Sequence, residues 1–244
     1  MASGKIAFIA GGGKHGSGAL RYFLKQPDWK TIVCDESSGC EASAFTKSQL
    51  KFEEMGDSTQ IASPTLIVGN AVGVALRFLA EGVVPRTVIP CVPFHFAAKV
   101  LTGYLTGKGL KVQPDFEHLK RAFGEAQLGG AEYRLDSGNA LAVASKMPFD
   151  RLCAPGCRQP KLCPMTRRRL ASPMYELIEE TLNRAGVDIV KVLRSRLIAS
   201  NVGGFQGEEL KRTLDLCVES EPCTIALATS CSCHAAANLF RIEG

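Results

Sequence analysis

Three cysteines stand close together in the second half of the chain, at Cys153, Cys157 and Cys163. Proline and glycine separate them, so the segment can turn back on itself and direct three thiols to one point. Residues 150–169 show no helical or strand periodicity of their own. A bound metal would supply the order that this composition does not. The sequence therefore predicts a Cys-ligated metal loop, against the plainer alternative of a loop without metal.

A fourth ligand must come from another part of the chain. The strongest source is the sequence Cys231-Ser-Cys233-His234, which follows the last predicted strand. We expect Cys231 and Cys233 to complete the site, and Cys217 and Cys223 are weaker candidates. The alternative for these later cysteines is a set of buried small residues.

The identity of the metal stays open between an iron–sulfur cluster and zinc. Cys163 is followed by Pro164, as is common at the last ligand of iron–sulfur loops. Nearby Arg and Lys side chains would stabilise an anionic [4Fe–4S] centre. Zinc sites usually consist of paired Cys knuckles, and only Cys153 and Cys157 form one. The Cys-Pro pair and the nearby bases favour [4Fe–4S], with zinc as the alternative, although the cysteine spacing matches neither the ferredoxin nor the radical-SAM pattern.

A glycine-rich turn lies between the first predicted strand and the first predicted helix, and reads Gly11-Gly12-Gly13-Lys14-His15-Gly16. This fits G-x-G-x-x-G, in which the glycines permit a tight turn, the approach of a pyrophosphate and close packing of helix on strand. The free N–H groups at the helix start attract phosphate. The sequence therefore predicts a dinucleotide site formed by Gly11, Gly13, Lys14 and Gly16.

Further residues lie where the neighbouring strands are expected to end. Asp35 closes the second predicted strand, where an acid hydrogen-bonds a ribose 2′-hydroxyl and repels a 2′-phosphate. With Glu36 beside it, Asp35 favours NAD over NADP. The turn at Gly69 and Asn70 lines the same crevice. His95 follows the fourth strand and is the candidate catalytic acid or base, unless it only starts a helix and bonds to backbone.

This part of the chain resembles the Rossmann NAD(P)-binding superfamily, and is most similar to its TrkA-N and siroheme-synthase-like members. The residues that carry the resemblance are Gly11, Gly13, Gly16, Ala19 and Asp35. The resemblance covers roughly residues 4–110 and implies a doubly wound parallel sheet that binds NAD at its carboxyl edge. The chain departs from the Rossmann pattern over residues 36–64, where the sequence signal for the usual helix and strand is weak.

Hydrophobic periodicity predicts alternating strands and helices in the first half. The predicted strands are Lys5–Ala10, Thr31–Cys34, Thr65–Val68, Thr87–Cys91 and Leu110–Val112. The predicted helices are Gly18–Lys25, Val72–Glu81 and His95–Leu105. This alternation indicates parallel α/β structure.

The pattern changes beyond about residue 115. The predicted helices are Phe116–Leu128, Met174–Ala185 and Glu208–Val218. The predicted strands are Asn139–Ser145, Asp188–Ile198 (one strand or a pair) and Thr224–Thr229, the last one. We therefore expect an α/β protein with a Rossmann-like half over residues 1–114 and an α/β half over 115–244 that carries the metal loop.

The composition is that of a globular protein, since 45% of the 244 residues are hydrophobic and 22% are charged. The charge-free stretch Ser58–Leu76 contains a proline and several polar residues, so it will not span a bilayer. The apolar run Ile6–Ala10 is too short for a signal peptide. A soluble, cytoplasmic protein is expected, in which ten cysteines indicate ligands or buried small residues more than disulfides.

The positive charge is concentrated in one segment. The chain has 29 Lys and Arg against 24 Asp and Glu. Residues 151–169 contain no acid and six bases, so 23 bases against 24 acids remain elsewhere. The bases are Arg151, Arg158, Lys161, Arg167, Arg168 and Arg169. This local excess, without interleaved aromatic residues, opposes a general nucleic-acid surface.

Three functions follow from these residues. The leading hypothesis is a redox protein that binds NAD and an iron–sulfur cluster, and we lean towards an NAD-dependent oxidoreductase acting on a small substrate. Hydride transfer moves two electrons and a cluster usually one, which counts against a direct couple without a flavin. The second is an NAD(H)-sensing module with a structural zinc or a redox-sensing cluster. The third, and weakest, is a zinc-stabilised nucleic-acid-associated protein.

The sensing alternative gains support because no strong catalytic constellation is evident. Tyr104 and Lys108 have the spacing used by short-chain dehydrogenases, but they straddle a predicted helix end, so we interpret the match as coincidence. The expected partners are a small molecule or a redox partner, with no membrane, and nucleic acid is disfavoured. The sequence leaves open whether the protein forms a homo-oligomer.

Overall fold

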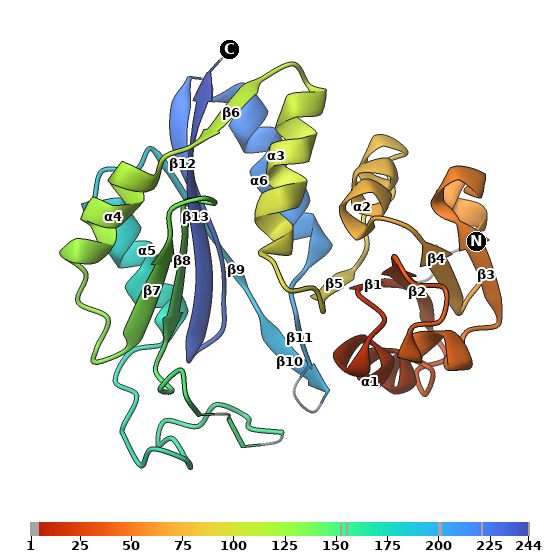
Figure 1. The fold of residues 1–244 in the computed structure, drawn as a ribbon, viewed down its shortest axis with the longest axis horizontal. Helices are drawn as coiled ribbons and strands as arrows, with labels where there is room; N and C mark the ends of the chain where they lie inside the picture. The colour runs from red at the N-terminus through yellow and green to blue at the C-terminus, as the bar shows by residue number, and fades with distance from the viewer. Residues whose placement is uncertain (1–4, 152, 155, 200–201, 221, 244) are drawn as a thin grey trace. The chain divides into compact units, whose positions relative to one another are not determined.

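The computed structural model describes residues 5–151, 153–154, 156–199, 202–220 and 222–243. The chain divides into two compact units (Figure 1). The first contains Met1–Phe96 and Arg196–Lys211, and the second contains Ala97–Ser195 and Arg212–Gly244. The division between residues 114 and 115 that the sequence suggests stays a prediction.

The first unit contains a five-stranded sheet in which every neighbouring pair is parallel, in the order β3-β4-β2-β1-β5. Its strands are β1 (Lys5–Ala10), β2 (Trp29–Asp35), β3 (Ser48–Lys51), β4 (Thr65–Val68) and β5 (Thr87–Pro90). The order β4-β2-β1-β5 corresponds to the 3-2-1-4 order of doubly wound folds. The predicted α/β fold with a parallel sheet in the first half is therefore confirmed.

Two helices connect these strands, α1 (Lys14–Phe23) and α2 (Ala71–Ala80). Helix α1 begins before the predicted Gly18, because the end of the glycine-rich turn is itself helical. The region that was uncertain from sequence contains β3 and three short 3₁₀ turns. These turns are η1 (Glu41–Phe45), η2 (Phe52–Glu54) and η3 (Ser58–Gln60).

A hairpin from late in the chain also belongs to the first unit. Strands β10 (Arg196–Ala199) and β11 (Val202–Gly204) pair antiparallel. The next residue, Phe205, exchanges two backbone hydrogen bonds with Val88 of β5, at 2.8 and 3.0 Å. The predicted strand over Asp188–Ile198 is therefore a pair, β9 and β10, whose members belong to different units.

The second unit contains a six-stranded sheet in the order β7-β8-β13-β12-β9, with β6 also paired to β13. Its strands are β6 (Lys111–Pro114), β7 (Glu132–Asp136), β8 (Leu141–Ser145), β9 (Ile189–Arg194), β12 (Cys223–Ser230) and β13 (His234–Glu243). Only the β9–β12 pair is parallel among these described strands.

Helices of the second unit pack on this sheet. Their bounds are α3 (Phe96–Gly107), α4 (Phe116–Gly124), α5 (Met174–Arg184) and α6 (Gly207–Glu219), of which α3 and α6 begin in the first unit. Buried Leu119 and Phe123 of α4 meet Ile178 and Leu182 of α5 over small alanines of β12 and β13. These small side chains let the helices lie close to the sheet.

The sequence prediction missed β13, because Thr224–Thr229 was expected to be the last strand. Strand β13 pairs with β12, β8 and β6, and most of its residues are buried. A central strand that is covered on both faces loses the apolar–polar alternation that reveals a strand. The consequence for the cysteines is direct: Cys231–His234 forms the turn of a β12–β13 hairpin.

A reciprocal contact joins the loop after α5 to the start of β12. The backbone N–H and the hydroxyl of Thr224 both donate to Asp188 Oδ2 at 2.7 Å, and the Asp188 N–H donates to Thr224 Oγ1 at 3.0 Å. The hydrogen bonds from the Thr224 side chain and backbone lower the pKa of the Asp188 carboxyl. Because its folded pKa lies below its unfolded value, Asp188 stabilises the fold at neutral pH and loses that contribution in acid.

We expect Asp188→Asn to lower the free energy of unfolding at pH 7 by about 1 kcal/mol or less, since the carboxyl is exposed. The difference from the wild type should shrink as the pH falls below the ordinary carboxyl pKa of 3.8. Urea titrations between pH 7 and 2.5 would measure it. The control is Asp28→Asn, whose side chain makes no hydrogen bond within the described residues. A difference that persists at pH 2.5 would contradict the prediction.

Candidate functional site

The glycine-rich turn is tightly packed at both ends. Gly11 has φ +100°, which favours glycine, and a Cβ there would lie 2.4 Å from the Cys91 carbonyl oxygen. A Cβ on Gly16 would lie 1.8 Å from the Gly11 carbonyl oxygen. Only glycine fits at these two positions without rearrangement, which is the steric role that the pattern assigns to them.

The middle of the same turn is open. Gly13 is exposed, and a Cβ there would meet nothing within 4 Å. Lys14 and His15 are also exposed, at the first residues of α1. The backbone at the start of the helix is thus accessible to a phosphate group, as a pyrophosphate site requires.

Asp35 lies against this turn at the end of β2. Its Oδ2 accepts a hydrogen bond from the Gly12 N–H at 2.6 Å, and its Oδ1 accepts one from the Ser37 N–H at 2.8 Å. The carboxylate therefore holds the turn, and each oxygen keeps a lone pair that a ribose hydroxyl could use. The Ala42 N–H donates to the Gly12 carbonyl at 2.8 Å, so η1 also contacts the turn.

The residues that follow the carboxyl ends of the neighbouring parallel strands take part in local hydrogen bonds. The Gly69 N–H donates to the Asp35 carbonyl at 2.9 Å, and Asn70 Oδ1 caps α2 by accepting the Gly73 N–H at 3.0 Å. The Cys91 N–H donates to the Ala10 carbonyl at 2.6 Å, and burial raises the pKa of its thiol to about 11. His95 is half-buried directly before α3.

A second group of candidate residues lies in the second unit, in the loop between β8 and α5. Within it, residues 161–170 form a short hairpin in which Leu162 pairs with Arg169. The Cys163 N–H donates to the Arg168 carbonyl, and the Arg167 N–H donates to the Cys163 carbonyl, both at 2.9 Å. These bonds fix the backbone on both sides of the Cys163 thiol.

Backbone N–H groups point at two of the cysteine sulfurs. Cys157 Sγ accepts the N–H of Gln159 at 3.4 Å. Cys231 Sγ accepts the N–H groups of Cys233 at 3.5 Å and His234 at 3.3 Å. Hydrogen bonds to the sulfur favour the thiolate, the form that binds metal, and such bonds tune metal–sulfur centres.

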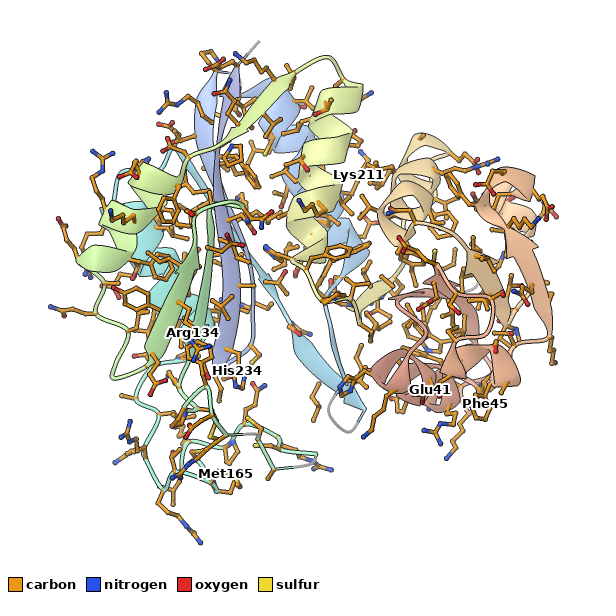
Figure 2. All side chains as sticks on the ribbon, in the orientation of Figure 1. Glu41, Phe45, Arg134, Met165, Lys211 and His234 are labelled. Atoms are coloured by element: carbon orange, nitrogen blue, oxygen red, sulfur yellow. The ribbon has the colours of Figure 1, made fainter. Side chains whose placement is uncertain are left out.

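The loop meets the β12–β13 turn, although about 70 residues separate them in sequence. Gln159 Oε1 accepts the Ser232 N–H at 2.9 Å. The His234 ring lies between two thiols, with Nε2 3.6 Å from Cys153 Sγ and Nδ1 3.6 Å from Cys231 Sγ. Figure 2 shows His234 at the end of the hairpin, above the loop that carries Met165.

The thiols of this cluster differ in acidity. Burial, together with neighbouring Cys157, Cys163 and Cys231, raises the pKa of Cys153. Burial also raises the pKa of Cys233 to about 12, assisted by the other thiols.

The pKa values of Cys231 and Cys163 are lowered instead. Burial opposes the thiolate of Cys231, but hydrogen bonds from His234 and Cys233 outweigh burial and lower its pKa. Hydrogen bonds from Thr166 and Met165 outweigh burial in the same way at Cys163. A bound cation would relieve the repulsion between these thiolates.

The cysteine sulfurs and the His234 ring are not arranged as the ligands of a bound metal would be. Across the described ranges, no group of three or more His, Cys, Asp or Glu side chains is arranged to hold a metal ion. The predicted ligands Cys153, Cys157, Cys163, Cys231 and Cys233 are near enough to interact electrostatically, but side-chain rotation would have to bring their sulfurs to a common centre. The prediction did not include His234, although its position beside Cys231 and Cys233 was a usable signal.

The weaker candidates from the sequence, Cys217, Tyr104 and Lys108, make contacts that belong to the fold. Cys217 is fully buried in the core, where burial raises its pKa to about 12. The Tyr104 hydroxyl donates to Asp215 Oδ1 at 3.3 Å, and the Lys108 ammonium lies 5.7 Å from the Tyr104 ring centre. No helix in the described part of the chain is long and apolar enough to cross a membrane.

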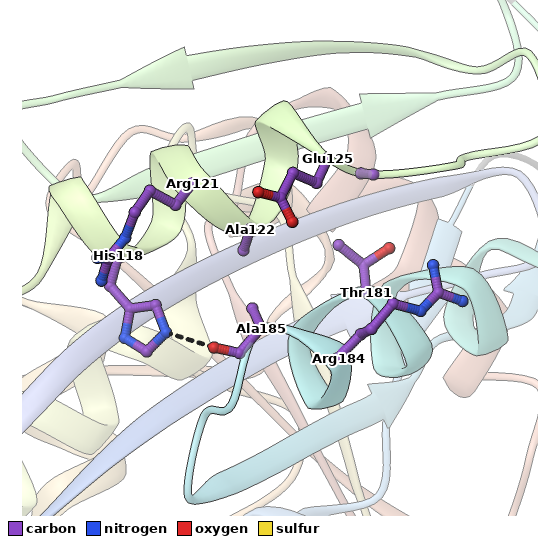
Figure 3. Close-up of a pocket in the computed structure, with 8 residues that line it drawn as sticks. His118, Arg121, Ala122, Glu125, Thr181, Arg184 and Ala185 are labelled. Atoms are coloured by element: carbon purple, nitrogen blue, oxygen red, sulfur yellow. Dashed lines mark hydrogen bonds between the residues drawn. The ribbon is translucent and has the colours of Figure 1, made fainter.

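A separate pocket of about 310 Å³ lies between α4 and α5 (Figure 3). The His118 Nε2–H donates to the Ala185 carbonyl at 2.9 Å on one side of it. Arg121, Glu125 and Arg184 bring charges of both signs to its wall. This mixture does not select one kind of ligand.

Comparison with known proteins gives little functional information. Residues 97–243 match the model of a family described as "Uncharacterized protein, C-terminal domain". A protein of Archaeoglobus fulgidus with the name "Uncharacterized protein" is 25% identical over 226 residues, covering 93% of this chain and 94% of that relative. No solved structure matches. The matched residues include both Cys153–Cys163 and Cys231–Cys233.

The difference in thiol acidity predicts selective alkylation of the reduced, metal-free protein. Cys163 and Cys233 are both half-buried, but the pKa of Cys163 is lowered and that of Cys233 is raised to about 12. We expect iodoacetamide at pH 7.5 to modify Cys163 at least about tenfold faster, because the thiolate is the nucleophile. Peptide mass spectrometry over a time course would measure both rates.

Cys217 is the internal control, since it should stay unmodified until denaturant exposes the core. Equal rates at Cys163 and Cys233 would show that hydrogen bonds from Thr166 do not activate the Cys163 thiol.

Proposed function

The chain belongs to the AF_1314_C family, and we propose that it is a redox protein that binds a nicotinamide dinucleotide in its first unit and an iron–sulfur cluster in its second. The observation that carries the proposal is the set of backbone N–H groups directed at Cys157 and Cys231, in two segments joined by the Gln159–Ser232 bond. Such hydrogen bonds support thiolate ligands rather than buried neutral thiols.

Four of these cysteines would ligate the proposed cluster once their side chains rotate to a common centre. Cys153, Cys157 and Cys163 would provide three, and Cys231 the fourth, because hydrogen bonds already favour its thiolate. Cys233, whose pKa is about 12, is the less suitable neighbour. When bound, such a cluster supplies one-electron transfer.

Lys146 provides a cation beside this donor set. Its backbone N–H donates to the Cys233 carbonyl at 2.9 Å, and its ammonium interacts electrostatically with Cys233 and Cys231. An ammonium at this position offsets negative charge on the thiolates. It would therefore stabilise an anionic centre and raise its reduction potential.

Structural zinc is the second candidate, and His234 favours it. Its two ring nitrogens lie 3.6 Å from the sulfurs of Cys153 and Cys231. Three cysteines and one histidine form a common tetrahedral zinc site. In that case the chain would be an NAD(H)-sensing module whose metal orders the loop.

The first unit supports the dinucleotide part of the proposal. Gly13 leaves space for a pyrophosphate, and exposed Lys14 adds positive charge beside it. Asp35 would accept a ribose hydroxyl and repel a 2′-phosphate, which favours NAD over NADP. His95 is the proposed acid or base for a proton that accompanies turnover.

We expect anaerobically purified protein to contain iron with matching acid-labile sulfide and a broad visible absorption band. Cys157→Ser should lose most of the metal, because one thiolate ligand disappears. The Cys217→Ala variant is the control and should keep it, since Cys217 lies in the core. Elemental analysis and sulfide determination would measure these contents.

His234→Ala separates the two metals. An all-cysteine cluster survives this change with its sulfide, whereas a zinc site that uses His234 loses its metal. A Cys157→Ser variant with full metal content would exclude the loop as the site.

Asp35→Asn tests the nucleotide preference, because it keeps an acceptor for Gly12 and removes the charge. We expect weaker NADH binding and a ratio of NADPH to NADH affinity that rises by about tenfold, since the repulsion of the 2′-phosphate is removed. Fluorescence titration with both cofactors would measure the ratio. An equal loss for both cofactors would instead indicate that Asp35 acts only by holding the turn.

A further inference from the structure

The cysteine loop carries an unusual concentration of unpaired positive charge. All six of its bases are exposed, and their side chains make no hydrogen bond or ion pair within the part of the chain that the structure describes. They are Arg151, Arg158, Lys161, Arg167, Arg168 and Arg169, and we call them, with Leu162 and Met165, the basic surface.

This charge is not shared by the rest of the molecule, where 23 bases face 24 acids. Arg167, Arg168 and Arg169 are consecutive in the chain, and neighbouring like charges repel one another at physiological salt, where the screening length is about 8 Å. A solvated surface with acids interspersed would avoid that cost. A surface without acids is complementary to a negatively charged partner and speeds its approach.

Apolar side chains lie on the same hairpin. Leu162 is 53% exposed and Met165 is 45% exposed, in a turn whose backbone is fixed by the Leu162–Arg169 pairing. Methionine and arginine are enriched at protein interfaces, and charge steers the approach. Nucleic acid offers phosphates to the arginines but little to Leu162 and Met165, and residues 151–169 contain no aromatic side chain for base stacking.

The position of the hairpin indicates what such a partner would do. Cys163, a proposed ligand, lies within it, and Thr166 of the same turn hydrogen-bonds the Cys163 sulfur. A protein bound to residues 161–170 would therefore stand beside the proposed centre. Weak electron-transfer complexes bury less than about 1,200 Å², so such a partner needs only a small docking surface.

We propose that the basic surface is the docking site for a small acidic electron-transfer protein. The identity of the partner as a redox protein rests on the proposed function. In the exchange, the reduced partner gives one electron to the oxidised centre and leaves oxidised by one electron. No bond forms or breaks, and no proton moves.

The test uses the full chain and a fluorescently labelled, acidic plant-type [2Fe–2S] ferredoxin as the probe. Arg167→Glu/Arg168→Glu/Arg169→Glu should weaken binding at least about tenfold, and raising the salt from 50 to 200 mM should weaken wild-type binding. The matched control is Lys25→Glu/Lys47→Glu/Lys120→Glu, which changes the net charge equally at exposed positions elsewhere. It should bind nearly as well as the wild type. Leu162→Ser/Met165→Ser should weaken binding while the salt dependence stays the same.

Two results would overturn the docking proposal: equal losses in the basic-surface variant and the control, or tighter binding of a 20-base-pair DNA duplex than of the ferredoxin. Stopped-flow reduction of the protein by reduced ferredoxin is measured separately. Surface-dependent binding without electron transfer, on a protein that contains zinc, would overturn the proposed redox function and leave an acidic-protein docking site standing.

Discussion

The pairing of β12 with β13 is the interaction on which the second unit depends. It places β13 at the centre of the sheet, where β8 and β6 also bond to it, and it closes the turn at Cys231–His234. That turn holds its neighbours through backbone groups: the Ser232 N–H donates to Gln159, and the Ser232 carbonyl accepts the N–H of Met174 at the start of α5. The cysteine loop, which lacks periodic structure, is thus positioned by a hairpin that is far away in sequence.

As proposed, both sites would use backbone N–H groups to stabilise negative charge. In the first unit, the exposed start of α1 at Gly13 and Lys14 offers N–H groups to phosphate, and Asp35 fixes the turn through the Gly12 N–H. In the second unit, backbone N–H groups donate to the sulfurs of Cys157 and Cys231, and at Cys231 such hydrogen bonds lower the thiol pKa. Backbone dipoles suit this purpose because they are fixed by the fold and need no reorganisation when the anion binds or forms.

Local features of the fold could be predicted from sequence, and long-range ones could not. The parallel strands and the glycine-rich turn were predicted, because a buried apolar run followed by glycines carries its own signal. The position of the β10–β11 hairpin in the first unit depends on pairing between Val88 and Phe205, which no local pattern records. The Cys231–His234 segment was predicted as a source of ligands, but the position of the His234 ring between two thiols follows from β13, a central strand without alternation.

The electrostatics and the order of the cysteine loop depend on one another. A few backbone bonds hold residues 161–170, and the described residues of the loop form no helix and only an isolated β-bridge to resist repulsion among its six bases. Metal bound between Cys153, Cys157, Cys163 and Cys231 would place anionic charge beneath these bases and link the loop to the β12–β13 hairpin. The same event that completes the centre would therefore hold Arg167–Arg169 and Met165 in a fixed arrangement. A partner that recognises the basic surface would then bind the loaded protein more tightly than the empty one, since metal binding has already restricted side chains and loop that the partner would otherwise have to order.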